Sequence, residues 1–144
     1  MSGYLLDTMV LEAFHRSRVP EKWRRPWKDI REGRRTVVLV EELLAELYHQ
    51  IARRTGGDKA RHWILWLKRL PRARVCPADD PIAFETGQLY LQFHGPCSLS
   101  LADCFALAFA RRERVELMTT EVGLRRAAEE IGVLVSWLPV TALA

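Results

Sequence analysis

The sequence predicts a single α/β domain whose central parallel sheet has about five strands and carries helices on both faces. Three observations lead to this expectation. The chain has 144 residues, the usual length of one compact domain. Its composition, 49% hydrophobic and 28% charged, is typical of a globular protein with a substantial core. Short apolar runs alternate with helix-like segments, and this alternation is typical of strands that pair in parallel through helical crossovers.

The expected strands are short. The first is the apolar run at 4–6, which ends abruptly at Asp7 and so resembles a buried parallel strand with a polar residue at its carboxyl end. The second is the β-branched run at 36–40. Further strands are expected at 73–76, 115–119 and 133–138.

Helices are expected between these strands, with recognisable first and last residues. Thr8 can cap a helix that extends to about Phe14, and the glycine pair at 56–57 ends a helix at 41–54. Asp58 can cap the next helix, whose apolar stripe begins at Trp63.

The second half of the chain has further helix signals. The run 79–81, Asp-Asp-Pro, opens a helix to about residue 93, and 94–96, His-Gly-Pro, should end it. Ser100 and Asp103 match a capping box ahead of a nearly all-apolar, hence buried, helix at 101–112. A last helix is expected at 121–131.

The net charge of +4 is concentrated in one segment. Residues 16–35 hold nine basic and three acidic side chains, residues 1–15 contribute −2, and residues 36–144 sum to zero. Trp23, Trp27 and Ile30 recur at helical spacing in this segment, Pro20 suits a helix start, and Pro26 predicts a kink or a break.

Four acids are expected near the carboxyl edge of the sheet, where ligands of open parallel sheets bind. They are Asp7 after the first strand, Glu46 on the helix after the second, Asp103 in the first turn of the buried helix, and Glu121 after the fourth strand. Converging carboxylates repel one another unless a cation neutralises them, and hard divalent ions prefer oxygen ligands. Such a site can activate water for attack on a phosphodiester.

Four stretches in order resemble the PIN-domain ribonucleases, best known as the VapC-type toxins of toxin–antitoxin pairs. They are YLLDTMVL at 4–11, LAELY at 44–48, LSLADCFALA at 99–108 and LMTTE at 117–121. The resemblance runs over nearly all of 1–144, and the basic segment 16–35 fits least well and is interpreted as an insertion. It implies an Mg²⁺- or Mn²⁺-dependent endoribonuclease, a cognate antitoxin and commonly a homodimer.

The resemblance also implies roles for single residues. The family's four acids match Asp7, Glu46, Asp103 and Glu121, with Asp7 and Asp103 as direct metal ligands. The fourth acid is usually Asp, and Glu121 is one methylene longer. The family's usual Asn after Asp-Thr or Asp-Ser is replaced by Met9.

Each acid also has a structural interpretation. Asp7 could cap the following helix, although Thr8 can do so. Glu42 lies one turn before Glu46 on the same helix face, and the expected burial of Glu46 beside Leu43, Leu47 and Tyr48 favours Glu46. Asp103 could simply complete the capping box. Glu121 could be a helix N-terminal acid favoured by the dipole.

The basic insertion has two interpretations as well. In the first it borders the active groove, where Arg24, Arg25 and Lys28 bind RNA phosphates or an acidic part of the antitoxin. In the second it is a solvated basic helix whose tryptophans pack on the core.

The remaining signals exclude other classes of protein. Cys76, Cys97 and Cys104 form no C-x-x-C pair, so neither a disulfide framework nor a zinc site is indicated, and Cys104 is interpreted as a packing residue. No apolar run approaches the roughly 18 to 20 residues of a membrane span, so we expect a cytoplasmic protein without a membrane partner. Two other functions remain open, a PIN-like binding module without catalysis and a structure-specific DNA nuclease.

Overall fold

The computed structural model describes residues 3–144 of the chain. Its five strands are β1 (Gly3–Leu6), β2 (Thr36–Val40), β3 (Ala73–Cys76), β4 (Glu116–Thr119) and β5 (Val135–Trp137). They form one sheet in the order β3-β2-β1-β4-β5, and every neighbouring pair is parallel. The α/β class and the five-stranded parallel sheet predicted from the sequence are therefore confirmed.

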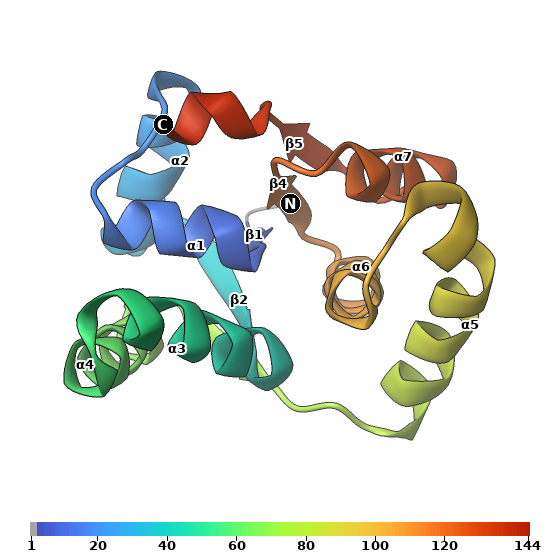
Figure 1. Cartoon of the computed structure of the whole chain (residues 1–144), viewed down its shortest axis with the longest axis horizontal. Coiled ribbons are helices and arrows are strands. Elements are labelled where there is room, and N and C mark those ends of the chain that lie inside the picture. The colour runs from blue at the N-terminus through green and yellow to red at the C-terminus, as the bar shows by residue number, and fades with distance from the viewer. Residues whose placement is uncertain (1–2) are drawn as a thin grey trace.

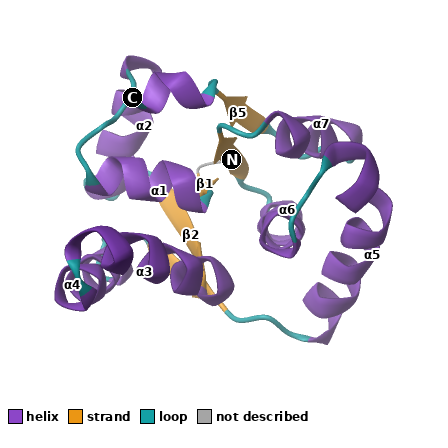
Figure 2. Cartoon of the chain, in the orientation of Figure 1, coloured by secondary structure: helices purple, strands orange, loops and turns teal. Residues whose placement is uncertain are grey.

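Helices cover both faces of this sheet (Figures 1 and 2). They are α1 (Thr8–His15), α2 (Glu21–Arg31), α3 (Glu41–Thr55), α4 (Gly57–Lys68), α5 (Asp80–Cys97), α6 (Leu101–Glu113) and α7 (Val122–Glu130), followed by the short 3-10 helix η1 (Val140–Leu143). The core of one face lies between the sheet and α5, α6 and α7, and that of the other lies under α1 to α4. Residues 3–144 contain no helix with the length and apolarity needed to cross a bilayer.

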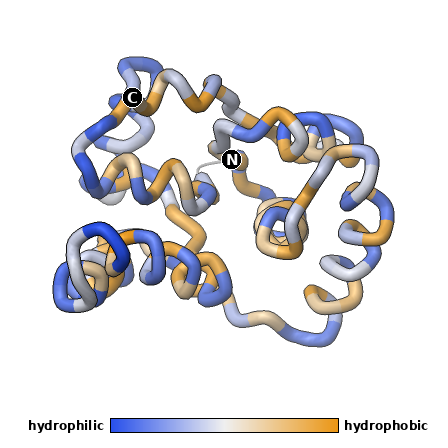
Figure 3. The backbone as a smooth tube through the Cα atoms, viewed as in Figure 1, coloured by the Kyte–Doolittle hydropathy of each residue, from blue (hydrophilic) through white to orange (hydrophobic). Residues whose placement is uncertain are grey.

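The two cores follow from alternation along the strands. In β1, Leu5 belongs to the core under α6 and Leu6 to the core under α1, because successive strand residues point to opposite faces. Figure 3 shows α6 as a largely apolar stretch, whereas the end of α3, whose last turn contains Arg53 and Arg54, is strongly hydrophilic. Both faces of the sheet are thus buried, as expected for an all-parallel sheet.

The helix ends differ from the sequence predictions at four places. Asp7, rather than Thr8, caps α1 with its side chain. The prediction that Asp58 caps α4 is wrong, since Gly56 is the N-cap residue and Asp58 lies inside the first turn of the helix. Helix α5 continues past residue 94, because Pro96 removes only one N–H from the last turn before the left-handed Ser98 ends the helix. The predicted break at Pro26 is absent, since α2 is one continuous helix.

Candidate active site

Four acidic side chains line one small pocket, and they are the four that the sequence singled out: Asp7, Glu46, Asp103 and Glu121. The cavity measures about 20 Å³, which is space for about one water molecule or ion. The acid pocket, as we call it, brings together residues that are up to 114 positions apart in the sequence.

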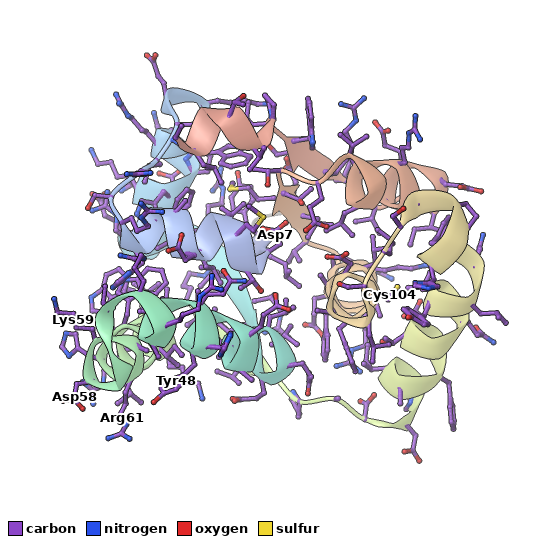
Figure 4. The ribbon with its side chains drawn as sticks, in the orientation of Figure 1. Asp7, Tyr48, Asp58, Lys59, Arg61 and Cys104 are labelled. Carbon is purple, nitrogen blue, oxygen red and sulfur yellow. The ribbon has the colours of Figure 1, made fainter. Side chains whose placement is uncertain are left out.

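The fold explains why these acids meet. Asp7 follows β1 and Glu121 follows β4, and these two strands are parallel neighbours at the centre of the sheet, so their carboxyl ends lie side by side. Asp103 lies in the first turn of α6, and Glu46 lies on α3. Figure 4 shows Asp7 at the N-terminal end of α1, on the side that faces α6. The pocket is therefore at the sheet edge where parallel α/β folds bind ligands.

Asp7 is the most buried of the four acids, with 5% of its surface exposed. Its Oδ1 accepts a hydrogen bond from the backbone N–H of Val10 at 3.0 Å, and its Oδ2 accepts one from the hydroxyl of Thr119. Burial raises the pKa of Asp7 to about 6, and the negative charges of Asp103 and Glu46 add to the effect, while the two hydrogen bonds oppose it. Asp7 thus both caps α1 and faces the pocket.

Asp103 likewise has both of the roles considered from sequence. The backbone N–H of Ser100 donates to its Oδ2 at 2.9 Å, and its own N–H donates to Oγ of Ser100 at 3.1 Å, which completes the capping box. The same half-buried carboxylate lines the acid pocket. A structural role for Asp103 therefore does not remove it from the site.

Glu121 is half-buried in the first position before α7 and makes no side-chain capping hydrogen bond there. Burial raises the pKa of Glu121 to about 8, and the negative charges of Asp103 and Asp7 contribute to this rise. Its carboxyl group lines the acid pocket and does not accept a hydrogen bond from the free backbone N–H groups in the first turn of α7.

Glu46 reaches the pocket for a reason different from the predicted one. The prediction relied on burial of Glu46 among Leu43, Leu47 and Tyr48, but its side chain is exposed, and so is that of Tyr48. Glu42 is the more buried of the two acids, yet it does not line the pocket. The rotation of α3 over the sheet, and not burial, selects Glu46.

Two threonines of the site were not assigned a role from the sequence. Thr119 is fully buried at the end of β4 and bridges Asp7 and the backbone of Glu121, from whose N–H its hydroxyl accepts a hydrogen bond at 3.1 Å. Thr8 lines the pocket, and its buried hydroxyl has no hydrogen-bond partner among residues 3–144. The sequence feature that could have indicated Thr119 is a polar residue at the end of the apolar strand β4, which pairs with β1.

The donor set has the chemistry of a hard divalent cation site. Four carboxylates and the unpartnered hydroxyl of Thr8 offer only oxygen, which Mg²⁺ and Mn²⁺ prefer. Within the described part of the chain, no three His, Cys, Asp or Glu side chains are already spaced to hold a metal ion. The residues fit such an ion in kind, and a bound cation would offset the repulsion among the carboxylates.

Cys104, beside Asp103, is a packing residue, as predicted. Cys104 lies on α6, and its side chain is completely buried in the core on that face of the sheet. Burial raises the pKa of the Cys104 thiol to about 11, so the thiol stays protonated at neutral pH.

The basic segment lies apart from the acid pocket. None of residues 16–35 lines that pocket, and Arg24 and Lys28 instead border a second hollow beyond the far end of α1. Trp23 and Trp27 are buried in the core, and Nε1 of Trp23 donates to Oγ of Ser136 at 2.9 Å, as the packing interpretation predicted. Binding of phosphates by this segment stays a prediction.

Comparisons with known proteins agree with this fold. The chain is similar to the structure of VapBC2 from Rickettsia felis bound to a DNA fragment from their promoter, with 14% identity, a TM-score of 0.71, and coverage of 94% of this chain and 98% of that one. The chain is also similar to FitAcB from Neisseria gonorrhoeae, with 26% identity, a TM-score of 0.63, and coverage of 92% of this chain and 95% of that one. A third similar structure is VapC20 of Mycobacterium tuberculosis, described as a sarcin-ricin loop cleaving toxin. Its identity to this chain is 18% and the TM-score is 0.68, with coverage of 86% of this chain and 94% of that one.

Sequence comparison identifies the family. No curated protein sequence matches the chain. The sequence model described as PIN domain matches residues 4–130, from the first strand to the end of α7 and across all four pocket acids. The chain belongs to the PIN domain family.

Proposed function

We propose that this PIN domain is a metal-dependent endoribonuclease that hydrolyses phosphodiester bonds of RNA, and that it is the toxin of a VapBC-type toxin–antitoxin pair. The observation that carries the proposal is the convergence of four carboxylates, from four separate elements, on one pocket at the carboxyl edge of the sheet. Fold likeness to proteins named VapBC and VapC supports it.

Two of the acids would hold the ion. Asp7 and Asp103 would bind Mg²⁺ or Mn²⁺, Glu46 would complete the site, and Glu121 would hold a second ion or orient the attacking water. When bound, such an ion would lower the pKa of a water molecule and polarise the phosphate.

The chain's own contribution is the positioning of these groups. Thr119 holds the Asp7 carboxylate through its hydroxyl, and Ser100 holds that of Asp103 through its backbone N–H. Because hydrogen bonds fix both oxygens of Asp7 and one oxygen of Asp103, the orientation of these acids is set before substrate arrives. Burial and the charges of the neighbouring carboxylates raise the pKa of Glu121 to about 8 in the metal-free protein, so a bound cation would favour the ionised form of this side chain.

The proposal includes partners and a location. The substrate is RNA, a cognate antitoxin inhibits the enzyme, and the toxin acts in the cytoplasm as a homodimer. Proteins of similar fold were described as VapBC complexes and as a toxin–antitoxin complex from Klebsiella pneumoniae, which supports the antitoxin part.

The test is a cleavage assay on purified protein with RNA and Mn²⁺ or Mg²⁺. We expect cleavage that EDTA abolishes and that Asp7→Asn and Asp103→Asn reduce by at least about a hundredfold. Asp58→Asn is the matched control, because Asp58 is an exposed acid at the outer end of α4 (Figure 4). Retained metal-dependent cleavage in Asp7→Asn and Asp103→Asn would overturn the assignment, and preferential cleavage of flap DNA would identify a DNA nuclease instead.

A second candidate is a PIN domain kept as a binding module without catalysis. Met9 favours it, since an apolar side chain, 37% exposed, lines the acid pocket where the family usually has Asn. Isothermal titration with Mn²⁺ separates the two functions. A protein that binds RNA but no Mn²⁺ is a binding module.

A further inference from the structure

A second hollow of about 340 Å³ lies where the end of α1, the segment after it and α2 meet. It has an apolar floor and a cationic rim. Phe14, Val19 and Trp27 form the floor, with the rings of Phe14 and Trp27 only 4.9 Å apart between centroids. Arg24, Lys28 and Arg31 form the rim. We call this feature the α2 hollow.

The three rim cations lie on one stripe of α2, since they are four and three residues apart. Among residues 3–144, no acidic side chain forms an ion pair with any of them. The nearby acid Asp29 is already paired with Arg25 at 3.5 Å and with Arg34 at 2.9 Å. The rim therefore presents three uncompensated positive charges, whereas Arg25 is separate from it.

Two depressions border α1 between the acid pocket and this rim. Met9 lines the acid pocket and also a groove of about 220 Å³, to which Ala13 and Arg16 belong. Ser17, the next residue, lines the α2 hollow. Helix α1, which separates the acid pocket from the α2 hollow, is eight residues or roughly 12 Å long. An extended ligand that leaves the acid pocket along α1 would reach the α2 hollow within this distance.

Single-stranded RNA matches these depressions in both charge and chemistry. Its phosphates repeat along the strand and suit the rim, and its bases suit the apolar floor, as in other grooves that combine cations with aromatic side chains. A polyanion cleaved in the acid pocket must also continue beyond the cleaved bond. The carboxylates of an acidic peptide would satisfy the rim but would leave the aromatic floor, on which bases can stack, uncovered.

We propose that the α2 hollow is a second RNA-binding site, at which Arg24, Lys28 and Arg31 hold the phosphates of a single strand away from the bond that is cleaved. This inference rests on the proposed function, because it takes the substrate to be RNA. The inference replaces Arg25 of the sequence prediction with Arg31 as the third cation. Arg25 is paired with Asp29. Arg31 lines the hollow, with its guanidinium 5.9 Å from the ring centroid of Trp27.

The experiment measures binding without cleavage. The anisotropy of a fluorescein-labelled oligouridylate, long enough to span both sites, is followed in EDTA at several salt concentrations. The variant is Arg24→Ala/Lys28→Ala/Arg31→Ala, whose three positions are all exposed on α2, so folding should be preserved. The matched control, with the same change in charge, is Lys59→Ala/Arg61→Ala/Arg126→Ala. Lys59 and Arg61 are exposed on α4 (Figure 4), and Arg126 is exposed on α7.

The expected result is a Kd for RNA that rises on the order of tenfold in the α2 variant at low salt, with a salt slope smaller by about 2, because each lost phosphate contact on a single strand contributes about 0.7. The control variant should bind within about twofold of the unmodified chain. Equal losses in both variants would show only a general charge effect and overturn the proposal. Competition by polyglutamate as effective as that by unlabelled RNA would overturn it too, in favour of an acidic protein.

The same variants separate this inference from the proposed function. If the unmodified chain cleaves RNA and the α2 variant binds it normally, the second site is wrong and the nuclease assignment stands. If the unmodified chain binds RNA through α2 but never cleaves it, the second site stands and the nuclease assignment fails.

Discussion

The hydroxyl of Thr119, at the end of β4, donates a hydrogen bond to Oδ2 of Asp7, at the end of β1. The same hydroxyl oxygen accepts a hydrogen bond from the backbone N–H of Glu121 at 3.1 Å. Because Thr119 is 0% exposed, water cannot replace either bond. One buried hydroxyl thus fixes two of the pocket acids relative to each other.

Replacing Thr119 with valine should damage both the fold and the site. Asp7 would lose one of the two hydrogen bonds that lower its pKa, and the pKa should rise above its present value of about 6. We expect the free energy of unfolding, measured in urea, to fall by about 1 to 3 kcal/mol, and Mn²⁺ binding to weaken. Thr119→Ser is the control, because it keeps the hydroxyl and loses a methyl group worth about 1 kcal/mol. Equal Mn²⁺ affinities in the two variants would contradict the role given to Thr119.

The two roles of Asp103 should separate by mutation. Asp103→Asn retains an oxygen that can accept the N–H of Ser100, so the free energy of unfolding should change by less than about 0.5 kcal/mol, while metal-dependent cleavage is lost. Ser100→Ala should show the reverse, a loss of about 1 kcal/mol with cleavage retained. Denaturation and cleavage measured side by side test this pair. If Ser100→Ala abolished cleavage without loss of stability, the cap would be part of the chemistry.

Three of the acids could be predicted because their positions follow from local sequence. Asp7 comes directly after an apolar strand and Glu121 two residues after another, and parallel pairing brings the two strand ends together. Asp103 belongs to a capping box whose motif is visible in four residues. For these positions, knowledge of the strand or helix end was enough to place the side chain.

Other features depend on how elements rotate and pack, which periodicity does not specify. Glu46 faces the pocket although it is exposed, so burial inferred from its neighbours was a poor guide. The bridge made by Thr119 needs the register of β4 against β1. The placement of α2 at the far end of α1 depends on the packing of Trp23 and Trp27, and the sequence alone left open whether its cations border the acid pocket.

Stability of the metal-free protein should fall as pH rises through the range in which the pocket acids ionise. The pKa of Glu121 is raised from 4.5 to about 8 and that of Asp7 from 3.8 to about 6. A carboxyl with a raised pKa binds its proton more tightly in the folded state, so its stabilising contribution is complete below the unfolded pKa and is lost as pH passes the folded pKa. We expect Tm to decline from about pH 4.5 to pH 8 on this account.

Substitution of Glu121 should remove much of that decline. A glutamine side chain cannot ionise, so Glu121→Gln should have a higher Tm than the unmodified chain at pH 8, where Glu121 is about half charged, and a similar Tm near pH 4.5. Thermal scans in EDTA measure the difference. Glu130→Gln, at an exposed position of α7, should keep the original pH profile. A Glu121→Gln profile parallel to that of the unmodified chain would mean that Glu121 is not held among the other acids.

Mn²⁺ affinity should fall at acidic pH for the same reason. A metal ligand must be deprotonated, and the metal-free Asp7 has a pKa of about 6. Between pH 7 and pH 5 the ionised fraction of such a group falls about tenfold, so the Kd for Mn²⁺ measured by titration calorimetry should rise by about that factor. An affinity independent of pH over this range would exclude Asp7 as a direct ligand.

Met9 should limit the activity of the site. It lines the acid pocket and is 37% exposed, and the PIN-type ribonucleases usually have Asn there. A carboxamide can donate a hydrogen bond to a neighbouring carboxylate, which a thioether cannot do. We therefore expect Met9→Asn to raise kcat for RNA cleavage about severalfold, with little change in Tm because the position is half-exposed near the start of α1. Met9→Leu keeps an apolar side chain and should behave as the unmodified chain does. If the two variants had the same kcat, the missing polar group at position 9 would not be what limits catalysis.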